Sequence, residues 1–336
     1  MLLHPSIIAL LLASALSSAA LLASAIFAAG LLRHWNLASG SERQITLERR
    51  TYLVSTALKL ALAAEAGSLL LFVFNADKMA PLFVGAMCAV GTLNVNPFGF
   101  PALILKLAVF FMAASWLILN HVDSQGYDYP LIRHKYAALL IMAPVALLGA
   151  YVQLRYFMEL KADVLTSCCS TLFGGSTVVT TNDVTLASET WSLAGLFLAL
   201  GATGLIGLWH LRSGHGGSLY ALLSLATLAV ALIAIVSVVS VYVYEQPHHH
   251  CPFCLLKQEY GYLGYALYLP LFLGSASGFG SGIAALAGRL PSLAQPAPLM
   301  AAGFTRLSLM GFLLFAGVAT GIILHSNLIL FEGGLR

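Results

Sequence analysis

The chain is organised as a series of long apolar runs separated by short polar stretches. Each run spans roughly 20 residues or more, the length that a helix needs to cross about 30 Å of hydrocarbon. Strands of a membrane barrel would instead alternate apolar and polar residues over about ten positions. The pattern therefore predicts an all-α polytopic transmembrane helical bundle of about eight spans. The expected spans are 6–32, 51–75, 102–120, 136–157, 191–211, 219–244, 261–288 and 304–325.

One further apolar segment, residues 81–93, is shorter than the length that a membrane span needs. Apolar runs of 10–14 residues are more typical of re-entrant or interfacial pieces. The sequence NVNPFGFP follows it, and its Asn, Pro and Gly residues favour a turn over a helix. We therefore expect 81–93 to be a re-entrant or short element.

Composition places the chain in the membrane class. Apolar residues make up 60% and charged residues 9%, and the mean hydropathy is +0.90. A soluble domain carries about 25% charged residues, so most of this surface must face lipid. The net charge of +3 is scattered over loops, with no basic stripe that would indicate nucleic-acid binding. With no internal repeat or soluble domain visible, residues 1–336 are expected to form a single integral membrane domain.

Loop charges predict the orientation, because cytoplasmic loops carry the excess of Lys and Arg. In the eight-span arrangement nine basic residues fall inside and five outside, against eight and six with nine spans. The inner set is Arg33, Arg43, Arg49, Arg50, Arg133, Lys135, Arg212, Arg289 and Arg306, and the outer set is Lys78, Arg155, Lys161, Lys257 and Arg336. Both termini and the loops 158–190 and 245–260 then face outward. The N-terminal run lacks a basic n-region and is read as the first span rather than a signal peptide.

The densest chemistry lies in residues 245–265, EQPHHHCPFCLLKQEYGYLGY. The two-residue spacing of Cys251 and Cys254 allows a small disulfide ring. A helix N-terminus and cationic neighbours would lower the pKa of the first thiol and raise its thiolate fraction. Cys251 is therefore expected to be the exchanging thiolate and Cys254 its resolving partner. The Cys-Pro-Phe-Cys motif resembles the Cys-Pro-aromatic-Cys of glutaredoxins, over four residues and without their soluble scaffold. An inert disulfide or a pair of packed thiols is the alternative.

A second cysteine site is DVLTSCCSTLFGGST, with adjacent Cys168 and Cys169. Adjacent cysteines close a disulfide only with strained geometry, so either one is expected to pair with a cysteine of the other loop. Two cysteine pairs on one membrane face resemble the organisation of disulfide-forming membrane oxidoreductases and the vitamin K epoxide reductase family. This resemblance implies a relay between the pairs, a periplasmic thiol protein as partner and a quinone as acceptor. The phrases SCCSTLF and HHHCPFC also resemble an uncharacterised bacterial multi-spanning membrane protein family, which implies a bacterial inner membrane.

The histidines of the same loop support a competing interpretation. His248, His249, His250, Cys251 and Cys254 could supply most of a tetrahedral copper or zinc site, since thiolates favour Cu(I) and imidazole suits both metals. Three consecutive histidines cannot all reach one ion, so one or two would be bystanders. A structural membrane subunit without chemistry of its own is the third possibility.

Other polar and small residues in the spans carry weaker expectations. Glu65 lies mid-span, where a carboxylate is costly enough to suggest a proton carrier, or else a protonated packing residue. Lys59 and Lys106 lie nearer span ends and are expected to snorkel towards the interface. Gly274, Gly278 and Gly282 repeat at the spacing of close helix packing. Two residues are expected to be structural, and six tyrosines are expected to form an interfacial aromatic belt. The structural residues are Cys88 and His325, and the tyrosines are Tyr242, Tyr244, Tyr260, Tyr262, Tyr265 and Tyr268.

Overall fold

The structure, a computed structural model, describes residues 4–36, 39–161, 164, 166, 189–246 and 249–328. These residues form helices and turns, without a strand among them. Within these described residues eight helices are long and apolar enough to cross a membrane, which confirms the predicted all-α polytopic bundle. The chain divides into two compact units. Unit 1 comprises Met1–Thr166 and Ala287–Pro296, and unit 2 comprises Ser167–Leu286 and Ala297–Arg336.

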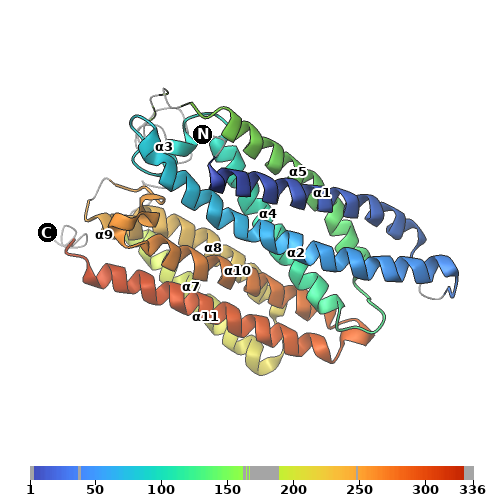
Figure 1. The fold of residues 1–336 in the computed structure, drawn as a ribbon. Helices are drawn as coiled ribbons and strands as arrows, with labels where there is room; N and C mark the ends of the chain where they lie inside the picture. Colours follow the sequence, from blue (N-terminus) through green and yellow to red (C-terminus); the bar gives the residue numbers. More distant parts are fainter. Residues whose placement is uncertain are drawn as a thin grey trace. The chain divides into compact units, whose positions relative to one another are not determined.

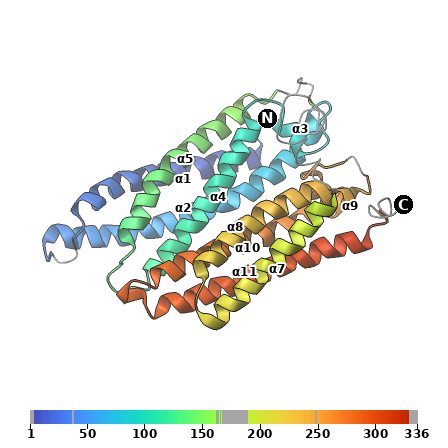
Figure 2. The same ribbon diagram turned by 180° about the vertical axis from the view of Figure 1, so that it is seen from behind.

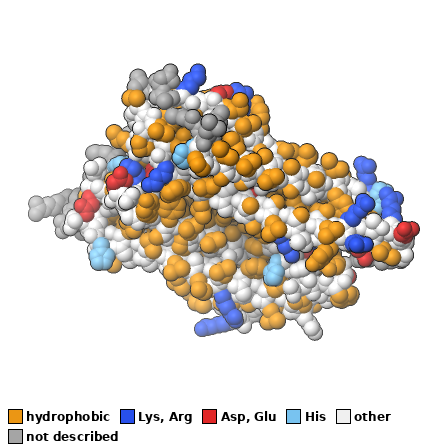
Figure 3. Space-filling model, viewed as in Figure 1, with side chains coloured by type: hydrophobic (Ala, Val, Ile, Leu, Met, Phe, Trp, Pro, Cys, Tyr) orange, Lys and Arg blue, Asp and Glu red, His pale blue; other side chains and the backbone are white. Residues whose placement is uncertain are grey.

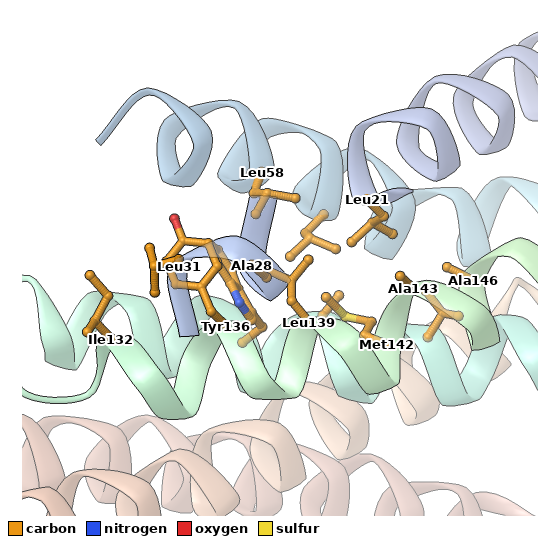
Figure 4. Close-up of a cluster of buried hydrophobic side chains, with 14 of the residues drawn as sticks. Leu21, Ala28, Leu31, Leu58, Ile132, Tyr136, Leu139, Met142, Ala143 and Ala146 are labelled. Atoms are coloured by element: carbon orange, nitrogen blue, oxygen red, sulfur yellow. The ribbon is translucent and has the colours of Figure 1, made fainter. Parts of the chain in front are cut away.

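Unit 1 is an up-and-down bundle of four long helices (Figures 1 and 2). They are α1 (Pro5–His34), α2 (Glu42–Met79), α4 (Gly99–Asp123) and α5 (Ile132–Met158). Contacts join α1 to α2, α2 to α4, α4 to α5 and α5 back to α1, so the helices form a closed ring. In Figure 4 the ring encloses apolar side chains from these helices, among them Leu21, Leu58, Leu139 and Met142. Tyr136 lies within this cluster and its hydroxyl donates to the Thr51 carbonyl at 3.3 Å.

The doubtful segment between α2 and α4 does not cross the bundle. It forms a 3₁₀ turn, η1 (Ala80–Leu82), and a single helical turn, α3 (Ala89–Leu93), preceded by Cys88, which is buried. Thr166 fixes the segment, with its backbone N–H on the Val84 carbonyl at 3.0 Å and its hydroxyl on the Gly91 carbonyl at 2.8 Å. The expectation of a short element here is confirmed.

Charged residues occupy one end of unit 1, where α1 gives way to α2. Figure 3 shows basic side chains gathered over this end and apolar side chains along the helices. The α4–α5 connection lies at the same end, because Arg133 donates to the Trp35 carbonyl at 3.0 Å. The basic residues assigned to the cytoplasmic side in this half of the sequence are therefore grouped at one end of unit 1.

The expected snorkelling of Lys106 is wrong, because this lysine is buried inside unit 1. Its Nζ pairs with Glu65 Oε1 at 2.9 Å, and the two side chains are 4% and 9% exposed. Because Glu65 on the neighbouring helix pairs with its ammonium group, Lys106 does not have to extend to the membrane interface. The position of Lys106 along its own helix does not indicate such a partner. Lys59, by contrast, is exposed.

Unit 2 also contains four spans (Figures 1 and 2). The helices are α7 (Glu189–Ser213), α8 (Gly217–Ala234) continued by the π-helical turn η2 (Ile235–Val239) and α9 (Ser240–Tyr244), α10 (Leu263–Ala287) and α11 (Pro296–His325). Three hydroxyl pairs join neighbouring helices, at 2.7, 2.8 and 2.7 Å, and such bonds stabilise helix association in lipid. The pairs are Thr203–Thr227, Tyr220–Ser308 and Ser281–Thr305.

The glycine stripe on α10 lies at close helix contacts, as predicted. A Cβ on Gly278 would overlap the Ser224 side chain of α8, and one on Gly274 would lie 3.3 Å from backbone atoms of α11. A Cβ on Gly282 would lie 2.5 Å from Ala221. Only residues without a side chain let α10 approach both neighbours at these positions.

Candidate functional site

The loop 245–260, here called the Cys–His loop, belongs to unit 2 and begins at the end of α9. Glu245 turns the chain out of the helix in a left-handed conformation, with φ 53°. Its Oε1 accepts hydrogen bonds from the backbone N and Nδ2 of Asn327, both at 2.9 Å. Ser326 donates to the Tyr242 carbonyl at 2.8 Å. The end of α11 thus anchors the point where the loop begins.

The π-helical turn η2 provides the acceptor for a histidine of the loop. His250 Nδ1 lies 3.2 Å from the Val236 carbonyl, which also accepts from Ser240 Oγ at 2.8 Å. Because a carbonyl oxygen only accepts, Nδ1 carries the hydrogen, and in the neutral imidazole Nε2 then has the lone pair. A π turn inside an α-helix is rare and often occurs at functional sites.

Two tyrosines hold the backbone around the first cysteine. The Tyr244 hydroxyl donates to the Cys251 carbonyl, and the Tyr268 hydroxyl donates to the Pro252 carbonyl at 3.0 Å. The Tyr244 ring packs on His249 with centroids 4.2 Å apart, and on Tyr260 at 4.8 Å. Tyr244 is buried, as is Tyr242, so these two do not belong to a lipid-facing belt and that expectation is wrong for them.

The two cysteine sulfurs of the loop lie within 4.8 Å of each other. Cys251 is 1% exposed and Cys254 6%, and no disulfide is formed among the cysteines that the structure describes. Bonded sulfurs are about 2.05 Å apart, so rotation of the side chains has to close the remaining separation. Residues 251–254 therefore hold two thiols at the distance from which a disulfide can form.

The helix expected immediately after the second cysteine is a short 3₁₀ turn. Cys254 begins η3 (Cys254–Leu256), which η4 (Gln258–Tyr260) follows, and the long helix α10 starts only at Leu263. A three-residue turn has no helix dipole of consequence. The loop instead packs on α10 where Gly264 lacks a side chain, since a Cβ there would lie 2.7 Å from Leu256 Cδ2.

Tyr260 connects the thiols to an open groove. Burial, and next the negative charge of a Cys254 thiolate, raise the pKa of Tyr260 above its ordinary value, so this phenol stays neutral at physiological pH. The groove has a volume of about 510 Å³ and lies between the end of α9, the start of α10 and the end of α11. Tyr242, Glu245, Leu263 and His325 contribute to its wall.

The predicted site residues are only partly described. Cys168, Cys169 and His248 lie outside the described residues. His249 and His250 are engaged by Tyr244 and Val236 in the way given above. The residues that sequence reasoning missed are Val236 and the loop-binding hydroxyls of Tyr244 and Tyr268, because a wide helical turn has no sequence signature and tyrosines near a span end first suggest a lipid interface.

No family model, curated protein or solved structure matches this chain. The resemblances of the cysteine motifs to glutaredoxins, to disulfide-forming membrane oxidoreductases and to a bacterial membrane family therefore stay predictions.

Proposed function

We propose that this integral membrane protein is a thiol–disulfide oxidoreductase that uses Cys251 and Cys254. The observation that carries the proposal is the pair of sulfurs within 4.8 Å of each other in a loop whose backbone is held at two successive carbonyls. Because Tyr244 and Tyr268 hold the backbone at two successive carbonyls, the two thiols stay close to each other while a disulfide opens and closes. Such preorganisation suits a pair that alternates between thiols and disulfide.

The exchange proceeds in two balanced steps. The Cys251 thiolate attacks a partner disulfide, one S–S bond breaks as another forms, and the released thiolate takes a proton. Cys254 then attacks the Cys251 sulfur, which closes the Cys251–Cys254 disulfide and releases the partner's second thiol. Two electrons pass from the loop to the partner, or the reverse, according to their reduction potentials. In the reverse direction a partner dithiol reduces the Cys251–Cys254 disulfide, and the loop then passes two electrons to the second site, Cys168 and Cys169. A membrane quinone would supply the terminal acceptor of these two electrons, together with two protons.

We propose that the partner binds in the groove beside Tyr260 and reaches the two thiols from there. Its volume of about 510 Å³ lies within the range of about 300–1,000 Å³ that small-molecule pockets occupy. It suits either a cysteine-bearing peptide or a quinone ring. A neutral Tyr260 phenol can donate a hydrogen bond where an attacking or leaving thiolate carries negative charge.

The proposal requires an oxidising compartment, and we place the Cys–His loop on the outer face of a bacterial inner membrane. Two spans, Trp191–Ser213 and Gly217–Tyr244, separate the loop from segment 158–190. Crossing the membrane twice returns the chain to the same side, so both cysteine loops share a face whichever way the protein is oriented.

Trapping of mixed disulfides tests the proposal. In a Cys88→Ser background, Cys254→Ser should accumulate a mixed disulfide through Cys251, visible as a shifted, reductant-sensitive band on a non-reducing gel. Cys251→Ser should accumulate far less, since Cys254 is the resolving thiol. Equal trapping would leave the pair redox-active but make the assignment of exchanging and resolving thiols wrong. No trapping in either variant, with all cysteines reduced in cells, would remove the oxidoreductase proposal.

Copper or zinc binding by the same loop is the second candidate, supported by the orientation of His250. Histidines that ligate metals commonly donate their other ring N–H to a carbonyl, as His250 Nδ1 does to Val236. Neither His249 nor His250 has a ring nitrogen grouped with the two thiols, so the loop would have to close around an ion. His250 Nε2 and the two thiolates would then contribute three ligands, with His248 or His249 as the fourth.

Metal analysis separates the two candidates. Protein purified without chelator should carry a stoichiometric ion that is lost in His249→Ala/His250→Ala and on acidification, because ligand thiolates take up protons as pH falls. Oxidation of Cys251 and Cys254 to a disulfide should also release the ion. Protein that holds no copper or zinc and traps no disulfide leaves the third class, a structural membrane subunit.

A further inference from the structure

A second polar cluster lies inside unit 1, among the membrane-spanning helices. All four helices of the ring contribute to it: Ser14 from α1, Glu65 and Ser68 from α2, Lys106 from α4 and Gln153 from α5. We call these five residues the Glu65 cluster. Polar groups inside a span are costly and commonly line ion or proton sites.

Lys106 occupies the centre of this cluster as a cation held by oxygens. Its Nζ donates to Glu65 Oε1 at 2.9 Å, Ser68 Oγ at 2.8 Å and Ser14 Oγ at 3.2 Å. An ammonium group has three hydrogens, so these three acceptors saturate it. The acceptors come from two helices other than its own, and together they surround a monovalent positive charge.

Two buried polar atoms of the cluster have no hydrogen-bond partner. Glu65 Oε2 is buried and has no hydrogen-bond partner, on a side chain that is 9% exposed. The fully buried Gln153 places Oε1 at 3.3 Å from Ser14 Oγ, and its Nε2 has no partner. Exchanging the two ends of the amide, which look alike, would leave its oxygen unpartnered instead. Other buried polar atoms of unit 1 also lack a hydrogen-bond partner, but here two of them, from α2 and α5, belong to one cluster around a buried charge, which leaves capacity for a ligand.

The other buried ion pair of unit 1 shows what a closed arrangement looks like. Lys135 pairs with Asp123 Oδ2 at 2.7 Å and donates to Asn120 Oδ1 at 3.1 Å. Asp123 Oδ1 accepts from the Leu131 backbone N at 2.8 Å. Asp123 Oδ2 accepts no hydrogen bond but lies directly against the Lys135 ammonium group, whereas Glu65 Oε2 has neither a hydrogen bond nor an ion-pair contact.

We propose that the Glu65 cluster is a monovalent-cation site in which a small alkali ion replaces the Lys106 ammonium. Deprotonation of Lys106 leaves a neutral amine and frees the oxygens of Glu65, Ser14 and Ser68 for the ion. One proton leaves as one cation enters, so the net charge buried in the membrane does not change. The open Glu65 Oε2 and the Gln153 amide supply the additional ligands that an alkali ion needs.

The charges that act on this exchange are few. Glu65 on α2 and Lys106 on α4 carry charge, whereas α1 and α5 present the neutral Ser14 and Gln153. Asp123 lies 17 positions beyond Lys106 on α4, about 26 Å along a helix, so the Lys135 pair acts only weakly on the cluster. Raising the pH removes the competing proton, so cation affinity must rise with pH.

Sodium binding by the purified chain in detergent tests the proposal, with choline chloride at equal ionic strength as control. The wild-type protein should bind sodium with an affinity that rises about tenfold per pH unit while Lys106 is mainly protonated, since one proton competes with one ion. In weakly buffered solution, sodium but not choline should release protons, detected with a pH dye. Sodium binding without any pH dependence or proton release would overturn the exchange.

Two variants should change sodium affinity in opposite directions, which makes the assignment of the site specific. Lys106→Met removes the tethered cation and should bind sodium tightly and independently of pH, whereas Glu65→Gln should lose sodium binding. Lys135→Met is the matched control, which removes a buried lysine from the same unit and should leave the wild-type sodium response intact. If Lys106→Met does not fold, Ser68→Ala should still weaken sodium binding without removing a charge. A Lys106→Met protein that folds and ignores sodium would refute the site.

Discussion

At the scale of single residues, hydrogen-bond partners decided which interpretations of the sequence were correct. Lys106 was expected to snorkel and is buried, because Glu65 and two serines on other helices satisfy its ammonium group. The hydroxyl of Tyr244 was expected at the lipid interface and instead holds the Cys251 carbonyl. A sequence states which groups a helix carries, but not which groups of other helices lie opposite. Partners distant in sequence could therefore not be predicted.

The Tyr244 hydroxyl gives a prediction at this scale. Tyr244→Phe removes the hydrogen bond to the Cys251 carbonyl and leaves the ring stacked on His249, so the loop should loosen locally. We expect a loss of about 1 kcal/mol in the free energy of unfolding and faster alkylation of Cys251 by a maleimide, measured by mass spectrometry. Tyr52→Phe, which alters a tyrosine that is 70% exposed, should change neither quantity. An unchanged alkylation rate in Tyr244→Phe would mean that this bond does not restrain the loop.

At the scale of elements, the sequence was a better guide. The eight long apolar runs correspond to the eight span-length helices, and the short segment 81–93 forms only turns and a single helical turn. The glycine repeat on α10 correctly indicated close packing. These features follow from local composition and periodicity. The absence of a long helix just after Cys254, by contrast, goes with the packing of Leu255 and Leu256 on Gly264 at the start of α10, and apolar composition does not encode it.

The glycine stripe leads to a prediction on stability. Gly278→Ala would place a methyl group on the Ser224 side chain, so α8 and α10 must move apart. Overpacking of this kind costs about 1–3 kcal/mol, and the midpoint of thermal unfolding in detergent should fall accordingly. Gly303→Ala on α11 is the matched control, because a Cβ there meets no atom within 4 Å. Equal midpoints for the two variants would show that the contact at Gly278 relaxes without cost.

At the scale of the whole molecule, composition and length were sufficient to establish an integral membrane protein. The expectation of one domain stays a prediction beside the two compact units of four spans each. The orientation stays a prediction from the distribution of basic residues, and the structure shows only that the basic residues near the start of α2 and of α5 share one end of unit 1. The chemical partner could not be derived at this scale, since neither composition nor fold specifies it.

Orientation is tested by labelling engineered cysteines at opposite ends of α8 and α9. In a background without the five native cysteines, Glu259→Cys should react with an impermeant maleimide in intact cells. His215→Cys, in the exposed link between α7 and α8, should react only after the membrane is opened. The reverse pattern would place the Cys–His loop in the cytoplasm, where its cysteines would be kept reduced.

The π-helical turn at Ile235–Val239 inserts one extra residue into the helix that carries Tyr244. The Ser240 backbone N–H bonds to the Ile235 carbonyl, five residues back, so the wide turn absorbs the extra residue and Ser240–Tyr244 keep nearly the phase of a regular helix. Deleting one residue of the five would restore the regular pattern, in which each carbonyl accepts from the backbone N–H four residues on. Such a deletion should leave membrane insertion and the face of Tyr244 intact, but weaken the contact between the Val236 carbonyl and His250 Nδ1. The extra residue thus acts on the cysteine loop through a carbonyl of the wide turn.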